Sequence, residues 1–302
     1  MNKEMGYGEF MAGLMAGLKG MMGKEYSFFM DDIPVINGNV KHSLTIRKEN
    51  NAAAPCICMD RFYHDYVNGY MKMEDIAEMA AGIYRKEMEH GDLDTEFIKD
   101  WESARKKIRF RLVNTERNAG MLSGMPYREF LDLSVVYYVQ VSMPGKINGM
   151  AHIHDRFLSF WDVDEEDLYC AAVENMPDTE LRSIVEVIGA FGTSEDVKKT
   201  NNMDGLLCGM YVLTNRNGLY GAACMLNMEM MRKAADSIGS DLWILPSSIH
   251  ELILIPKQEF YNVQDIAKMV KDVNDTELRP DELLSYHVYE YNRETEKVSI
   301  AA

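Results

Sequence analysis

The sequence lacks the features that most quickly place a protein in a class. Among its 302 residues there is no run of eighteen uncharged apolar residues, so no helix is expected to span a membrane. Its five cysteines are odd in number and include no CxxC pair, which argues against a disulfide framework and favours a reducing compartment. No P-loop, GxGxxG segment or G-x-S-x-G elbow is present, so the motifs predict no cofactor and no reaction.

Positive charge is scarce, and most of the imbalance lies in one part of the chain. The net charge is −16; residues 1–120 have 17 Lys+Arg against 19 Asp+Glu, and residues 121–302 have 15 against 29. An acidic surface disfavours nonspecific binding to nucleic acid or to an anionic membrane. It leaves a basic protein as a candidate partner or, as a lower alternative, mimicry of nucleic acid by aligned carboxylates.

The composition and the first residues predict a soluble protein. Hydrophobic residues make up 47% and charged residues 26% of the chain, which is typical of globular domains. Phe10, Leu14 and Leu18 recur at helical spacing, while Glu9 and Lys19 interrupt the apolar run. We therefore expect an amphipathic first helix rather than a signal peptide, and a cytoplasmic protein.

Residues 1–120 are expected to form a small N-terminal lobe. Two β-prone stretches flank an Asn-Gly pair at 37–38, which is a strong signal for a hairpin, and a third short strand follows. Apolar residues at helical spacing then predict two helices, over 73–90 and over 95–118.

Residues 121–302 are expected to form a larger, acidic lobe. LDLSVVYYVQVS, at 131–142, is nearly all β-branched or aromatic and is placed at the centre of a sheet. Hairpins are predicted over 210–227, 241–256 and 288–300, with helices between them. This order predicts an α+β fold in two lobes, with helices packed on a largely antiparallel sheet.

A polar corner interrupts two apolar strands at PSSIHE. Ser247, Ser248, His250 and Glu251 have neither the second histidine of a zinc protease nor the glycines of a serine nucleophile elbow. Serine hydroxyls bond the backbone in tight connections, so a structural turn is the favoured interpretation. The alternative is a ligand-binding site at the edge of the sheet.

The segment VNTERN offers the complementary half of such a site. Asn114 and Glu116 follow an apolar run where the two lobes are expected to meet. They would cap helix ends, or they would line a pocket between the lobes together with His250. The pocket hypothesis requires these side chains to converge in space.

Two weaker patterns suggest metal ligands. His152 and His154 would share a face of a strand, with Asp155 as a third ligand, although exposed strand histidines are commoner than metal pairs. Cys56 and Cys58 would also share a face, but zinc needs two further ligands and none lies at a typical spacing. We therefore predict no metal site and expect the thiols to be buried or half-buried.

The densest basic stretch lies within the helix predicted over 95–118. Its members are Arg105, Lys106, Lys107, Arg109 and Arg111. On a helix, Arg105 and Arg109 would share one face and Lys107 and Arg111 another. Phosphate binding is one interpretation; ion pairing with the acidic lobe, or simple solvation, is favoured over it.

The sequence resembles an uncharacterised family, domain of unknown function 5688, common in clostridial bacteria and often found within mobile genetic elements. The resemblance covers nearly the whole chain. It is carried by LVNTERNAGMLSGMPYREFLDLSVVYYV, GLYGAACML, ILPSSIHELILIP and MVKDVNDTELRPDELLSYHVYEYN. It implies that the PSSIHE and VNTERN segments belong to a shared pattern and that the HIHD segment does not. It implies no activity, cofactor or catalytic residue.

Two function classes follow from these observations. The first is a non-catalytic accessory or protein-interaction protein, carried as cargo by a mobile element, whose acidic lobe faces a basic partner. The second is an enzyme or small-ligand binder with a pocket between the lobes around Glu116 and His250. The lack of a complete catalytic constellation favours the first.

Overall fold

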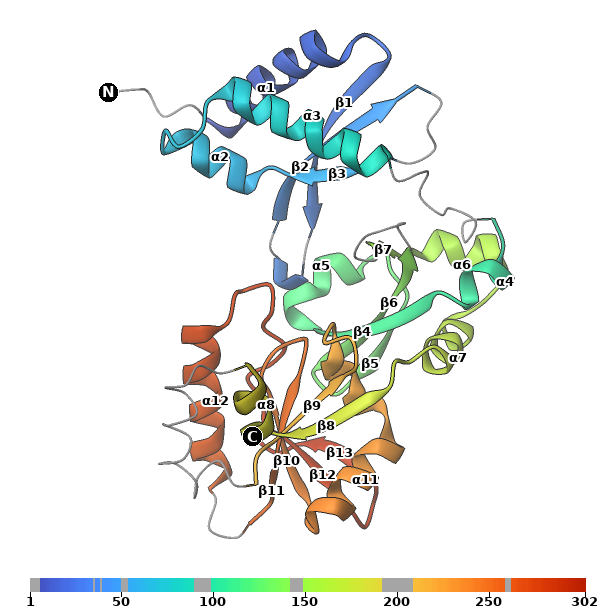
Figure 1. Ribbon diagram of the computed structural model, residues 1–302. Coiled ribbons are helices and arrows are strands. Elements are labelled where there is room, and N and C mark those ends of the chain that lie inside the picture. Colours follow the sequence, from blue (N-terminus) through green and yellow to red (C-terminus); the bar gives the residue numbers. More distant parts are fainter. Residues whose placement is uncertain are drawn as a thin grey trace.

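The computed structural model describes residues 6–34, 36–38, 40–49, 54–89, 99–141, 149–191, 209–258 and 262–302. Within these residues the chain has the predicted α+β fold, and its strands form three antiparallel sheets (Figure 1). We call them the N-terminal, middle and C-terminal sheets, in chain order.

The N-terminal sheet carries helices on one face. Its order is β1-β2-β3, with bounds Tyr26–Pro34, Val40–Lys48 and Cys56–Cys58. The pairing of β1 with β2 confirms the predicted hairpin. Helices α1 (Tyr7–Met22) and α3 (Met73–Glu89) share one apolar core with the sheet, and α2 (Asp60–Val67) follows β3. Cys56 and Cys58 are exposed, so the expectation of buried or half-buried thiols is wrong for this pair.

The middle sheet is organised around the strand that the sequence placed at its centre. Its strands are β4 (Ile108–Asn114), β5 (Tyr127–Phe130), β6 (Leu133–Val141) and β7 (Gly149–His152). β6 pairs with each of the other three. The segments around it are α4 (Trp101–Arg105), the 3-10 turn η3 (Glu116–Asn118), α5 (Ala119–Leu122), α6 (Asp155–Trp161) and α7 (Glu165–Glu174).

The helix predicted over 95–118 is wrong in its second half. Residues 95–98 lie outside the described residues, α4 is only five residues long, and 108–114 form strand β4. Ile108, Phe110 and Leu112 alternate with two arginines, which is the period of a strand. Pairing of all seven residues with β6 overrides the helix propensity of the basic residues. β4 thus joins the middle sheet, while the division at residue 120 stays a prediction.

The C-terminal sheet has the order β13-β12-β10-β11-β9-β8. The strand bounds are Thr179–Ser183 for β8, Tyr211–Asn215 for β9, Leu242–Pro246 for β10, Leu252–Pro256 for β11, Tyr289–Asn292 for β12 and Lys297–Ile300 for β13. The helical segments of this region are α8 (Ile184–Phe191), η4 (Gly221–Leu226), α11 (Met228–Ile238) and α12 (Val263–Glu277). The pairing confirms the predicted hairpins over 241–256 and 288–300.

The hairpin predicted over 210–227 is wrong. Its first strand exists as β9, but residues 221–226 form the buried 3-10 segment η4. β9 already has β8 on one edge and β11 on the other, so it has no free edge to pair with a following strand. The small residues Gly221, Ala222 and Ala223 allow the segment to pack beneath the sheet instead.

The tip of the β1–β2 hairpin inserts into the remainder of the molecule (Figure 1). Ile36 is buried in the core shared by the middle and C-terminal sheets. Asn37 has a left-handed backbone (φ 66°) and donates from Nδ2 to the carbonyl oxygens of Pro280 and Leu283, at 2.8 and 2.7 Å. Asn118 donates to Asn37 Oδ1 at 3.0 Å and accepts from its backbone N–H at 2.7 Å. One side chain therefore fastens three segments.

Replacing Asn37 with glycine tests this junction, because glycine keeps the left-handed backbone and removes three side-chain hydrogen bonds. We expect Asn37→Gly to lower the free energy of unfolding by about 2 kcal/mol, measured by urea denaturation. The matched control is Asn68→Gly, at an exposed helix end, which should change it by less than about 0.5 kcal/mol. Equal effects of the two substitutions would contradict the role assigned to Asn37.

Candidate functional site

Two arginines and their neighbours share one face of the middle sheet. Arg109 lies opposite Tyr138, and Tyr138 lies opposite His152 on the next strand. Residues opposite one another, and residues two apart, point to the same side of an antiparallel sheet. Arg111 therefore joins this face, which is turned toward the connection between β9 and η4.

That connection holds Tyr220 in a left-handed conformation, with φ 55° and ψ 31°. A bulky residue rarely adopts this backbone, and it persists only where its surroundings enforce it. Asn215 Nδ2 donates to the Leu219 carbonyl oxygen at 2.8 Å, and the Tyr220 N–H donates to His250 Nδ1 at 3.1 Å. These two hydrogen bonds fix the peptide group between Leu219 and Tyr220, one at its carbonyl oxygen and one at its N–H.

Gly221 allows the turn to lie directly on the sheet. A Cβ at this position would collide with Thr214 Oγ1 and the His250 carbonyl oxygen, and would lie 2.8 Å from the Asn215 nitrogen. Thr214 Oγ1 itself donates to the His250 carbonyl oxygen at 2.9 Å. The glycine is therefore required by close backbone approach.

The Tyr220 ring contacts four other side chains. It stacks on His250 at 5.5 Å between centroids and meets Tyr138 edge-on at 5.8 Å. The Arg111 guanidinium carbon lies 5.0 Å from its centroid, and Arg111 Nη1 donates to its hydroxyl at 3.1 Å. The hydroxyl also lies 3.9 Å from Met150 Sδ. Tyr220 and Met150 separate two cavities.

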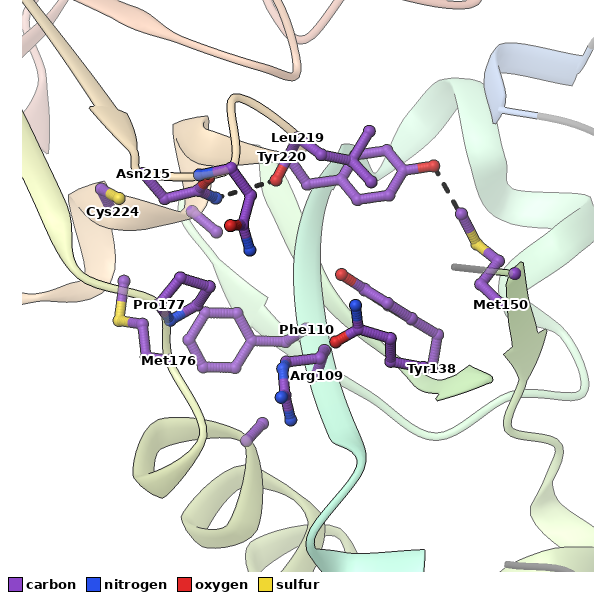
Figure 2. A pocket seen from close by; sticks show the side chains of 15 residues that line it. Arg109, Phe110, Tyr138, Met150, Met176, Pro177, Asn215, Leu219, Tyr220 and Cys224 are labelled. Atoms are coloured by element: carbon purple, nitrogen blue, oxygen red, sulfur yellow. Dashed lines mark hydrogen bonds between the residues drawn. The ribbon is translucent and has the colours of Figure 1, made fainter. Parts of the chain in front are cut away.

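The first, the Arg109 cavity, has a volume of about 300 Å³ (Figure 2). It lies between β4 and the β9–η4 connection. Its lining residues are Arg109, Phe110, Tyr138, Gln140, Gly149, Met150, Ala172, Met176, Pro177, Asn215, Asn217, Leu219, Tyr220, Ala223 and Cys224. Arg109 is the charged member of this set, and no aspartate or glutamate is among these described residues.

The second, the Arg111 cavity, has a volume of about 280 Å³ and extends toward the hairpin tip. It is lined by Ile36, Lys41, Arg111, Met150, His152, Tyr220, Ile249, His250, Arg279, Asp281 and Glu282. Lys41 pairs with Asp281 at 3.4 Å, and Arg279 pairs with Glu282 at 2.5 Å. Two of its cations are thus neutralised by its two acids.

Arg111 has no such partner. Its side chain is 4% exposed, and besides Tyr220 its guanidinium contacts His152 Nε2 at 3.2 Å and Met150 Sδ at 3.8 Å. Arg109 donates to the carbonyl oxygens of Ile108 and Lys106, at 2.9 and 3.4 Å. Neither arginine forms an ion pair with a carboxylate of the described residues. Partial burial lowers the pKa of Arg109.

Burial disfavours the protonated form of both histidines that line the Arg111 cavity. Burial, followed by Arg111 and His154, lowers the pKa of His152 to about 4. Since His152 accepts the Arg111 N–H at Nε2, its own proton lies on Nδ1. Burial also lowers the pKa of His250, although Glu282, 3.9 Å from Nε2, opposes this shift.

Of the four residues predicted at the polar corner, His250 lines the Arg111 cavity. Ser247 donates to the Glu251 carboxylate at 3.3 Å, Ser248 Oγ accepts the His250 N–H at 3.0 Å, and the Ser248 N–H bonds the Glu251 carbonyl. These bonds close the connection between β10 and β11. Whether the corner also binds a ligand stays a prediction.

Asn114 and Glu116 lie at another junction. Asn114 Oδ1 accepts the Arg117 N–H at 3.1 Å, its carbonyl accepts from Asn118 Nδ2 at 2.7 Å, and Glu116 begins η3. Neither residue lines the Arg109 or the Arg111 cavity. Asn114 supports the contact with the hairpin tip through Asn118, and a ligand site that joins Asn114 and Glu116 to His250 stays a prediction.

The predicted histidine pair is divided between two roles. His152 faces Arg111, whereas His154 is the exposed residue before α6, with Nδ1 3.3 Å from the Gly124 carbonyl, and Asp155 begins that helix. In the part of the chain that the structure describes, no three histidine, cysteine, aspartate or glutamate side chains are placed to hold a metal ion. A guanidinium beside His152 also repels a cation.

Sequence reasoning missed the centre of the site. Arg109 and Arg111 were assigned to a helix, and the alternation in IRFRLV is the signal that would have put them on one face of a strand. Tyr220 lies in the GLYGAACML segment that carries the family resemblance, but no local pattern indicates its role, which depends on a backbone conformation set by distant contacts.

The fold and the site together define an α+β protein with an arginine-containing cleft between two sheets. The chain belongs to the family of unknown function DUF5688, whose model matches residues 7–293. No curated protein and no solved structure gave a match. Among the described helices, none has the length and apolar character needed to cross a membrane.

The packing of Gly221 predicts a specific sensitivity. Gly221→Ala should lower the free energy of unfolding by about 3 kcal/mol, because backbone and Thr214 must move to admit the methyl group. Gly82→Ala, within α3 where nothing lies near the added carbon, should instead raise it by about 0.5–1 kcal/mol. Chemical denaturation of both variants provides the comparison, and a tolerant Gly221 would disprove the tight approach.

The lowered pKa of His152 predicts a pH dependence of stability. Its usual value is 6.5 and its value in the folded protein is about 4, so the unfolded chain binds more protons in this interval. The contribution is present above pH 6.5 and is lost as the pH falls toward 4. His152→Gln keeps an acceptor for Arg111 and should remove about 2 kcal/mol of this dependence. The control is the same substitution at the exposed His64, and equal effects of the two substitutions would contradict the role assigned to His152.

Proposed function

We propose that the protein binds a small anionic molecule in the Arg109 cavity, with Arg109 at the anionic group and the charge of Arg111 behind it. The observation that carries this proposal is the pair of arginines on one face of β4, neither within ion-pair distance of a described carboxylate. Arg111 is buried and Arg109 is half-buried. A charge withdrawn from water is costly unless it is paired, and a bound anion supplies the missing partner.

The charge distribution around the site supports the same conclusion. The chain has 48 acidic residues against 32 basic ones, yet none of the acids lines the Arg109 cavity among the described residues. In the neighbouring cavity, Lys41 and Arg279 are already neutralised by Asp281 and Glu282. The uncompensated positive charge is therefore concentrated at Arg109 and Arg111, where a low local dielectric strengthens its attraction for an anion.

Binding is favoured over catalysis because the reactive groups nearby are already engaged. His250 Nδ1 accepts the Tyr220 N–H and His152 Nε2 accepts from Arg111. Burial raises the pKa of the Cys224 thiol, and Thr179 donates to its sulfur at 3.5 Å. A nucleophile needs a free base within reach, and these contacts leave none of the three groups in that arrangement.

Substitution of the arginines tests the proposal, with inorganic phosphate and sulfate as probes. Arg109→Gln should weaken binding about tenfold or more in isothermal titration, since a hydrogen bond to a charged group is lost. Arg111→Met should also weaken it, because the second positive charge behind the anion is lost, although the lost bonds to Tyr220 and His152 should lower stability as well.

The matched control is Arg216→Gln. Arg216 lies on the same connection but is 73% exposed and pairs with Asp178 at 3.7 Å. Its loss should change phosphate affinity less than twofold. Equal losses in all three variants would indicate general surface electrostatics, and an absence of anion binding by the wild-type protein would refute the proposal.

The interaction hypothesis rests on charge alone. A basic protein partner for the acidic residues 121–302, a role as mobile-element cargo, mimicry of nucleic acid and a cytoplasmic location all stay predictions from the sequence. The partner would be displaced by salt, whereas a ligand bound in a cavity would be much less sensitive to it.

A further inference from the structure

We propose that the ligand of the Arg109 cavity is a planar heteroaromatic ring that carries one anionic group, the chemistry of a nucleoside monophosphate or an aryl phosphate. This inference rests on the proposed anion binding and adds the part of the molecule that the arginines do not recognise. It follows from three properties of the cavity: an apolar side, two amides and a small volume.

Part of the cavity wall is apolar. Phe110 is 7% exposed, and Met176, Pro177 and Leu219 line the same space (Figure 2). A hydrated inorganic ion gains nothing from such a wall, whereas a ring buries its faces against it. The wall therefore selects a ligand with an apolar, planar body.

Two side-chain amides are available to a ligand in the same space. Gln140, which is half-buried, and Asn217, which is exposed, both line the cavity. Asn215 differs, since its amide is already engaged by the Leu219 carbonyl and the Asn217 N–H. Amides both donate and accept, as the edge of a heteroaromatic ring does. A plain hydrocarbon ring would offer these amides no hydrogen-bond partner.

Arg109 and Tyr138 determine where the anionic group of the ligand would bind. Arg109 and Tyr138 are opposite one another on paired strands. Burial raises the pKa of Tyr138 to about 12, so its hydroxyl keeps its proton and can donate to an anion. Figure 2 shows Arg109 and Tyr138 on one side of the space and Asn215, Leu219 and Tyr220 on the other.

The volume limits the size of the ligand. About 300 Å³ is at the lower end of the range for small-molecule sites. It accommodates one ring system with a short substituent. It does not accommodate a folded peptide or a nucleic-acid chain, so a free monomer is the expected ligand.

A series of phosphate compounds distinguishes recognition of the ring from the proposed anion binding. Inorganic phosphate, cyclohexyl phosphate, phenyl phosphate and the common nucleoside 5′-monophosphates are titrated into the full chain by calorimetry. We expect phenyl phosphate to bind about tenfold more tightly than inorganic phosphate and more tightly than cyclohexyl phosphate, which is not planar. At least one nucleotide should bind more tightly than phenyl phosphate.

Substitutions of cavity residues test whether the cavity causes the difference in affinity between these phosphates. Leu219→Ala should lower the ratio of phenyl phosphate affinity to phosphate affinity at least threefold, and Asn217→Ala should lower the ratio of nucleotide to phenyl phosphate affinity. The control is Val273→Ala, an equally exposed apolar residue on α12, which should change neither ratio. If all phosphates bind equally, the ring is refuted and anion binding stands; if none binds, the proposed function itself fails.

Discussion

The contact between Arg111 and Tyr220 joins the two larger sheets, and much of the central region depends on it. The Arg111 guanidinium is 4% exposed, so its N–H groups need acceptors within the protein. It donates to the Tyr220 hydroxyl and to His152 Nε2, and it packs against the Tyr220 ring. Each partner is itself fixed: His152 by its strand, Tyr220 by a strained backbone above Gly221. The charge is thereby oriented without being neutralised, which is the condition for preorganised anion recognition.

The sequence predicted those parts of the fold that local pattern determines. The hairpin around Asn37 and the central strand at Leu133–Val141 were found because turn chemistry and β-branched runs are local signals. The segments at 108–114 and 221–226 were not. Their structure depends on which strand edges are already occupied, and that information lies in distant residues.

The candidate site was predictable only in part. A polar corner between apolar strands pointed to His250, which does line a cavity, although Ser247 and Glu251 bond each other instead. The arginines were visible as a basic cluster, but a helical assignment scattered them over two faces. Recognising a strand would have placed them together, whereas the engagement of Tyr220 requires the three-dimensional structure.

Because the hairpin tip lines the Arg111 cavity, ligand binding there is coupled to the position of the hairpin. Ile36 and Lys41, from the hairpin, complete the wall of the cavity that contains Arg111. A molecule whose affinity depends on that wall must, by reciprocity, hold the hairpin in place by the same factor. A ligand in the Arg111 cavity would then protect the amides of the β1–β2 hairpin from exchange with solvent.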